Sequence, residues 1–159
     1  MSGTTQIHGI YIDAPAEEVW KALTTSEHTR YGYGTTIDCD LRVGGSYRHL
    51  TTDAMKAMGM GDVAIEATIV ELDPPRRLVL DWKAAWHDEP ASRLTYDIQQ
   101  SPSGLTRLTL THELPDSPAT AADVAGSGDV ENGGGGWPWE LASLKTLLET
   151  GRPMTTAGA

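Results

Sequence analysis

Phenylalanine is absent from this sequence, whereas tryptophan and tyrosine occur 5 times each. Every tryptophan and tyrosine ring carries a polar N–H or O–H group, and such rings suit the wall of a wet cavity better than a dry core. Long hydrophobic runs are also lacking, because no segment approaches the roughly 20 apolar residues needed to span a bilayer. The first residues, Met1 to Gln6, have neither the basic nor the apolar part of a signal peptide. These absences predict a cytoplasmic protein.

Cysteine occurs once, as Cys39, so the chain cannot form an internal disulfide. Lysine and arginine are scarce as well, 12 against 22 aspartates and glutamates, which leaves a formal charge of -10 at pH 7. Binding to phosphate backbones or anionic lipids normally requires clustered basic side chains. Nucleic acid and membrane partners are therefore disfavoured, and the acidic surplus is typical of a solubility feature.

Motifs for metals and phosphates are missing too. Glu66, Asp81, His87 and Glu113 could each bind a metal, but none stands in a spacing such as His-x-x-x-His or Cys-x-x-Cys. The glycine run 133–136 lacks the lysine and the serine or threonine of a phosphate-binding loop, and no Gly-x-Ser-x-Gly elbow is present. The sequence therefore predicts no metal and no cofactor.

A length of 159 residues fits one domain, which we expect to have its ordered core at 6–151 and a frayed tail at 152–159. Segment 16–23 repeats apolar residues at helical spacing, and so does the segment from Trp137 to a glycine cap at Gly151. Segment 53–61 is rich in methionine and predicts a loop or a loose helical turn. Proline, glycine and small polar residues make 114–136 a flexible Gly-rich loop with little regular structure. Alternating strand patterns occur at 6–12, 36–43, 46–52, 62–72, 77–83, 92–100 and 106–113.

The order of these elements predicts an α+β architecture. Short connections, such as the tight turn at Gly44-Gly45, favour an antiparallel meander of seven strands. A strongly curved antiparallel sheet leaves one side to be covered, and the long amphipathic helix at the C-terminal end provides that cover.

Several motifs in this order resemble the Bet v 1-like or START-like (SRPBCC) superfamily, in its bacterial branch related to the C-terminal domain of the activator of Hsp90 ATPase. The motifs are IDAPAEEVWKALT at 12–24, DLRVGGSY at 40–47, VELDPPRRL at 70–78, THE at 111–113 with Thr109-Leu110 before it, and Gly136-Trp137 leading to LASLK at 141–145. The resemblance covers nearly the whole chain. It implies a helix-grip fold, with an internal cavity between the sheet and the C-terminal helix that holds hydrophobic small molecules in various members.

Strand alternation predicts which side chains line such a cavity. If Leu78 and Leu80 point inward, so does Trp82, and the same rule applied to the strands 46–52, 92–100 and 106–113 adds further rings and two histidines. Trp137 begins the closing helix, while Tyr33 and Trp86 occupy connections where an entrance is expected. The predicted ligand-binding residues are Tyr33, Tyr47, His49, Trp82, Trp86, Tyr96, His112 and Trp137.

The favoured function is binding of a small hydrophobic or aromatic molecule in this cavity. The alternative is an enzyme of the cyclase, dehydratase or isomerase type, in which His49 and His112 act as base and acid. Against that alternative, a histidine in a strand is more often a hydrogen-bonded structural residue. A weaker alternative, a partner of an Hsp90-type chaperone, follows only from the resemblance. A homodimer is compatible with exposed sheet edges.

Overall fold

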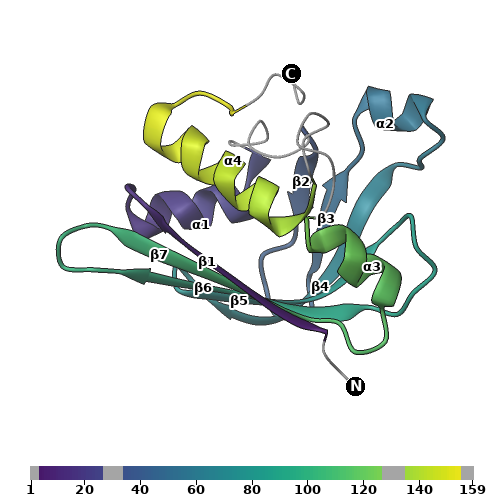
Figure 1. Cartoon of the computed structure of the whole chain (residues 1–159), viewed down its shortest axis with the longest axis horizontal. Helices are drawn as coiled ribbons and strands as arrows, with labels where there is room; N and C mark the ends of the chain where they lie inside the picture. Colours follow the sequence, from purple (N-terminus) through teal and green to yellow (C-terminus); the bar gives the residue numbers. More distant parts are fainter. Residues whose placement is uncertain (1–3, 27–33, 127–134, 155–159) are drawn as a thin grey trace.

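One seven-stranded antiparallel sheet dominates the protein, as the sequence predicted (Figure 1). The computed structural model describes residues 4–26, 34–126 and 135–154. Neighbouring strands in the sheet follow the order β1-β7-β6-β5-β4-β3-β2, so only β1 and β7 pair across a long stretch of chain. The strands are β1 Thr5–Ile12, β2 Thr36–Cys39, β3 Ser46–Leu50, β4 Val63–Asp73, β5 Arg77–Ala84, β6 Ser92–Gln100 and β7 Thr106–Glu113.

The predicted alternation of side chains is confirmed in the central strands. On β7, Leu108, Leu110 and His112 are buried, whereas Arg107 before them and Glu113 after them are exposed. This period of two sends alternate side chains to opposite faces of the sheet. The strands β5 and β6 carry their inward rings and leucines in the same way. One face of the sheet therefore builds the core.

Two helices cover that inner face: α1 (Ala16–Thr24) and α4 (Gly136–Thr150) (Figure 1). Along α4, the buried side chains Trp137, Leu141, Leu144 and Leu147 recur at helical spacing. Burying a leucine of this kind stabilises the fold by about 2 kcal/mol. The helix ends at Gly151, which has a φ of 76° and adopts the left-handed conformation that glycine accepts without a steric cost.

The strand predicted over 36–43 is shorter than expected. β2 ends at Cys39, because the chain turns back at Asp40, whose backbone N–H donates to the Ser46 carbonyl at 2.8 Å. The turn is so tight that a Cβ atom on Gly45 would lie 2.0 Å from the Asp40 carbonyl oxygen. Gly44 adopts a left-handed φ of 83° that glycine tolerates, so both glycines expected to mark the turn are needed in it, but the turn starts four residues earlier.

The methionine-rich segment contains a short helix, α2 (Asp53–Ala57). The Thr52 side chain caps it by accepting a hydrogen bond from the Met55 backbone N–H at 3.2 Å. None of the α2 residues is buried, so this helix lies at the periphery, beyond the inner face of the sheet (Figure 1).

The segment 114–136 was expected to have little regular structure, and that expectation is wrong for part of it. Helix α3 (Pro118–Val124) forms there, while residues 127–134 lie outside the described part. The carboxylate of Glu89, on the β5–β6 connection, accepts hydrogen bonds of 2.8–2.9 Å from the backbone N–H groups of Ala119 and Thr120. The cap of α3 thus comes from a distant part of the chain, which local sequence reasoning does not reveal. In the described part of the chain, none of the helices has the length and apolar character that crossing a membrane requires.

Candidate functional site

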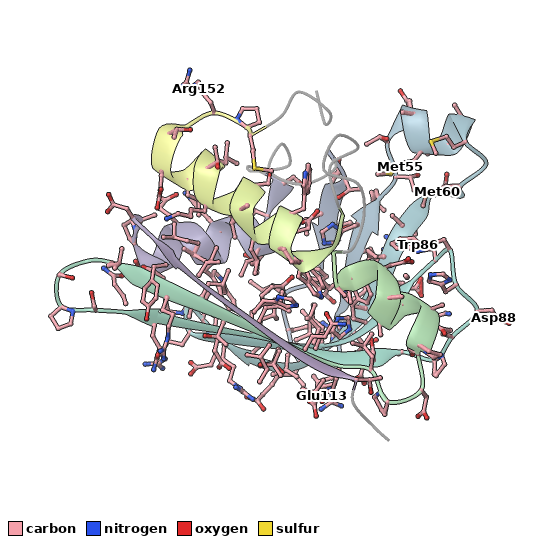
Figure 2. The ribbon with its side chains drawn as sticks, in the orientation of Figure 1. Met55, Met60, Trp86, Asp88, Glu113 and Arg152 are labelled. Carbon is pink, nitrogen blue, oxygen red and sulfur yellow. The ribbon has the colours of Figure 1, made fainter. Side chains whose placement is uncertain are left out.

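A cavity of about 530 Å³ lies between the inner face of the sheet and α4. Helices α2 and α3 border its outer end, where Met55, Met60 and Trp86 are found (Figure 2). Side chains from β3, β4, β5 and β6 form the floor. The lining residues are Thr35, His49, Met55, Met60, Ala64, Ile65, Trp82, Trp86, Tyr96, Ala122, Asp123, Val124, Gly135, Gly136, Trp137 and Glu140.

The aromatic wall of the cavity consists of rings that sequence reasoning had selected. The ring centroids of Trp82 and Trp137 are 5.7 Å apart, and those of Tyr96 and Trp137 are 6.5 Å apart. These rings are almost fully buried, whereas Trp86 is 48% exposed and marks the mouth. Neither the Trp82 indole N–H nor the Tyr96 hydroxyl hydrogen-bonds to any described residue, so both remain available to a ligand.

His112, which was also selected, does not line the cavity but supports its wall from behind. Its Nδ1 accepts a hydrogen bond from the Trp137 indole N–H at 3.0 Å, and its Nε2 lies 2.7 Å from the Ser92 hydroxyl. Because Nδ1 accepts, Nε2 carries the proton and donates to Ser92, whose hydroxyl donates in turn to the Trp82 carbonyl at 3.2 Å. Burial lowers the pKa of His112 to about 4, so the ring is neutral. Its described contacts fix Trp137 in place.

The two predicted ligand-binding residues on β3, Tyr47 and His49, lie in different surroundings from each other. Tyr47 is buried away from the cavity, and its hydroxyl donates to the Leu23 carbonyl at 2.5 Å, which joins β3 to α1. His49 does line the cavity, and its Nδ1 lies 2.9 Å from the Thr35 hydroxyl. Burial lowers the pKa of His49 to about 4, so it too is neutral near pH 7. Tyr33 lies outside the described residues.

Sequence reasoning missed Glu140, which is the most unusual residue of the cavity. Its side chain keeps some exposure because it faces the open volume, yet protein surrounds it, and this burial raises the pKa of its carboxyl to about 8. Glu140 forms no hydrogen bond or ion pair with any residue that the structure describes. A signal was present: position 140 falls on the apolar stripe of α4, between Trp137 and Leu144. An acidic residue on such a stripe has to face either the core or a cavity.

The mouth of the cavity is held by polar contacts between the β5–β6 connection and α3. The Trp86 indole N–H donates to the Asp123 carboxylate at 2.9 Å, and the same oxygen lies 2.5 Å from His87 Nε2. Burial opposes ionisation of Asp123, but the hydrogen bonds from Trp86 and His87 lower its pKa below the usual value. Asp123 was also missed, because its role depends on the position of α3.

Comparisons with known proteins agree with this architecture. The model of the family described as activator of Hsp90 ATPase homolog 1-like protein matches residues 13–149. Among solved structures, CalU16 from Micromonospora echinospora is 22% identical, with 97% of this chain and 78% of CalU16 covered and a TM-score of 0.67. The Aha1 dimer from Colwellia psychrerythraea is 18% identical, with coverages of 93% and 98% and a TM-score of 0.67.

A third similar structure is an HSP90 activator from Plasmodium falciparum. It is 24% identical, with 70% of this chain and 73% of the activator covered and a TM-score of 0.56. Identities at this level show a shared helix-grip fold and nothing finer. A comparison with curated protein sequences found no match.

Proposed function

The chain belongs to the family of activator of Hsp90 ATPase homolog 1-like proteins, and we propose that within this fold it binds a small hydrophobic or aromatic molecule. The observation that carries the proposal is the cavity of about 530 Å³ with its tryptophan, tyrosine and methionine lining. Ligand sites are typically concave, mostly apolar and roughly 300–1,000 Å³ in volume, with a few polar groups that orient the ligand. The cavity meets each of these criteria.

The rigidity of the wall supports the same proposal. Trp137 is held by His112 from behind, and Trp86 is held by Asp123 at the mouth. Side chains that are fixed before the ligand arrives lose little freedom when it binds, so less of the binding energy is spent on ordering them. Near neutral pH, His49 offers a neutral hydrogen-bonding group, since its pKa is about 4.

Native mass spectrometry after incubation with a metabolite extract tests the proposal. The wild-type protein should retain a small molecule, whereas Ala122→Trp should retain less, because Ala122 is exposed on α3 and lines the cavity. Ala119→Trp is the matched control, since Ala119 is exposed on the same helix and is not one of the described lining residues.

Two results would count against binding in this cavity. One is that a folded wild-type sample retains no compound. The other is that the two tryptophan variants reduce retention equally, because the loss would then come from a general effect on α3.

A second candidate is an enzyme of the cyclase, dehydratase or isomerase type that uses the same cavity. The observation that favours it is Glu140, because a carboxyl group with a pKa of about 8 can both give and take a proton near neutral pH. If the protein is such an enzyme, Glu140 and His49 carry out the proton transfers, while His112 positions Trp137. Conversion of a captured compound with time, and its loss in Glu140→Gln, would favour the enzyme; an unaltered compound would favour the carrier.

Two further proposals concern macromolecular partners. The family description makes an Hsp90-type chaperone a candidate partner, and stimulation of chaperone ATP hydrolysis by this chain is the test. The similar protein from Colwellia psychrerythraea is described as a dimer, and the sheet here ends in two edge strands, β1 and β2. Edge strands present unpaired backbone groups that a second copy can use. Light scattering would decide whether this chain forms a homodimer.

A further inference from the structure

The charged groups among the described residues of the cavity are all of one sign. Among the described lining residues, Asp123 and Glu140 bring carboxyl groups, and no lysine or arginine is present. The whole chain carries a formal charge of -10 as well. An organic anion such as a fatty acid would therefore meet the negative Asp123 carboxylate and the Glu140 carboxyl, and no described lining residue offers it a cationic partner.

Glu140 is the cavity carboxyl group that lacks a partner among the described residues. Asp123 already accepts hydrogen bonds from Trp86 and His87, whereas Glu140 has no such bond to a described residue. Lys145, the cation nearest to it along α4, is occupied by Glu149 at 2.6 Å and by the Tyr11 carbonyl at 2.7 Å. An unpaired carboxyl in an apolar setting gains the most from a ligand that donates hydrogen bonds and carries positive charge.

Aromatic rings stand beside this carboxyl. Tyr96, Trp137 and Glu140 line the main cavity together, and the same three residues border a smaller void of about 10 Å³ behind it, so they are neighbours. Burial raises the pKa of Tyr96, and the charge of Glu140 adds to the effect, which also places the two close together. Rings of this kind attract cations, most strongly where water is excluded.

We infer that the ligand is an amphipathic amine, whose protonated nitrogen sits between the Glu140 carboxylate and the rings of Tyr96 and Trp137 while its apolar body fills the cavity towards Met55 and Met60. This inference rests on the proposed function and adds the chemical class of the ligand. It is specific to the charge at one end of the cavity, so it can fail while the cavity still binds neutral molecules.

Such a ligand would leave a proton signature. With a pKa of about 8, Glu140 is mostly protonated at pH 7, and an ammonium group bound beside it favours the carboxylate. Binding at pH 7 should therefore release a large part of one proton for each amine bound. Of the other titratable groups, His49 and His112 have pKa values of about 4, Tyr96 has a raised pKa and Asp123 a lowered one, so none of these four titrates near pH 7.

The experiment is titration calorimetry with three probes that share one ring system: naphthylethylamine, naphthylethanol and naphthylacetate. Each is measured in buffers of different ionisation enthalpy, which reports the protons released. At pH 9, where Glu140 is already ionised and an alkyl ammonium is still charged, wild-type protein should bind the amine at least about 10-fold more tightly than the alcohol, because a hydrogen bond to a charged group is worth about 1.5–3 kcal/mol. At pH 7 the preference should be smaller, because part of the binding energy is used to deprotonate Glu140. The carboxylate should bind most weakly.

Two variants test whether Glu140 is the residue responsible for the preference for the amine. Glu140→Gln should abolish the preference for the amine and the proton release, while binding of the alcohol stays within about threefold. Glu113→Gln is the matched control: the chemical change is the same, but Glu113 is exposed and lies on the side of the sheet away from α4 (Figure 2). It should behave as the wild type.

The inference is wrong if the amine does not bind, if it binds no more tightly than the alcohol, or if Glu140→Gln keeps the preference. Tight binding of the alcohol with no preference for the amine would overturn the inference and leave the proposed function in place. Failure of all three probes, together with no compound captured from an extract, would overturn both.

Discussion

Replacing Glu140 by glutamine should make the protein more stable, by an amount that grows with pH. The substitution keeps the size of the side chain and removes its ability to ionise. At pH 4.5 the folded protein holds a neutral carboxyl, which resembles the neutral amide, so the two proteins should have nearly equal free energies of unfolding. At higher pH the carboxyl ionises readily in the unfolded chain but not in the folded one.

The sign and size follow from the raised pKa of Glu140. Between pH 4.5 and about 8 the folded state holds a proton that the unfolded state has released, so wild-type stability falls as pH rises. Each tenfold change in a protonation equilibrium corresponds to about 1.4 kcal/mol, so the full change in pKa sets an upper limit of about 5 kcal/mol above pH 8. The side chain faces a cavity that water can enter, so we expect an actual difference of about 1–3 kcal/mol.

Urea unfolding of both proteins across this pH range measures the difference. His49 and His112 also titrate differently in the folded and unfolded states, but both proteins share these histidines, so their contribution cancels. Glu113→Gln controls for the change in net charge and should differ from the wild type by less than about 0.5 kcal/mol at every pH. A stability difference between Glu140→Gln and wild type that is constant with pH, or that decreases as pH rises, would refute the assignment of a buried, unpaired carboxyl.

The other predictions concern the cavity and its supports. In Ala122→Trp, retention of a small molecule should fall while Ala119→Trp behaves as the wild type, as native mass spectrometry will show. The preference for an amine over an alcohol should disappear in Glu140→Gln, as measured by calorimetry. His112→Leu should lower the free energy of unfolding by about 2–4 kcal/mol, because the Trp137 indole and the Ser92 hydroxyl lose a buried partner; an unchanged urea midpoint would contradict the network. Glu89→Ala should speed amide hydrogen exchange at Ala119 and Thr120, which its carboxylate holds; equal rates would mean that α3 is stabilised by other contacts.

Much of the fold could be predicted because its signals are local. Alternation along β6 and β7 gave both strands their observed bounds, and it placed Tyr96 and His112 on the inner face. The glycine after the apolar stripe of α4 correctly marked the end of that helix. Period two and the positive φ of a glycine cap depend on neighbouring residues only, so they can be read without knowing the tertiary structure.

The candidate site could be predicted only in part. Trp82, Tyr96 and Trp137 line the cavity as expected, but Tyr47 has the same inward parity and lies instead against α1, where its hydroxyl meets the Leu23 carbonyl. The alternation of side chains along a strand determines which face of the sheet a residue lies on, but not which part of that face a helix covers. His112 is a similar case, because it points inward but does not line the cavity, and its Nδ1 accepts a hydrogen bond from the Trp137 indole.

The sequence by itself determined the sheet, its inner face, the covering helix and the family, because periodicity and motif order are properties of the chain alone. Only the tertiary structure decided which inward residues line a cavity and which fill the core. It also placed the carboxylate of Glu89 at the start of α3, and it left Glu140 beside Tyr96 and Trp137 without a described partner. Capping from a distant loop, burial of a charge and the volume left empty between elements all depend on distances between segments far apart in sequence, and those distances exist only once the chain has folded.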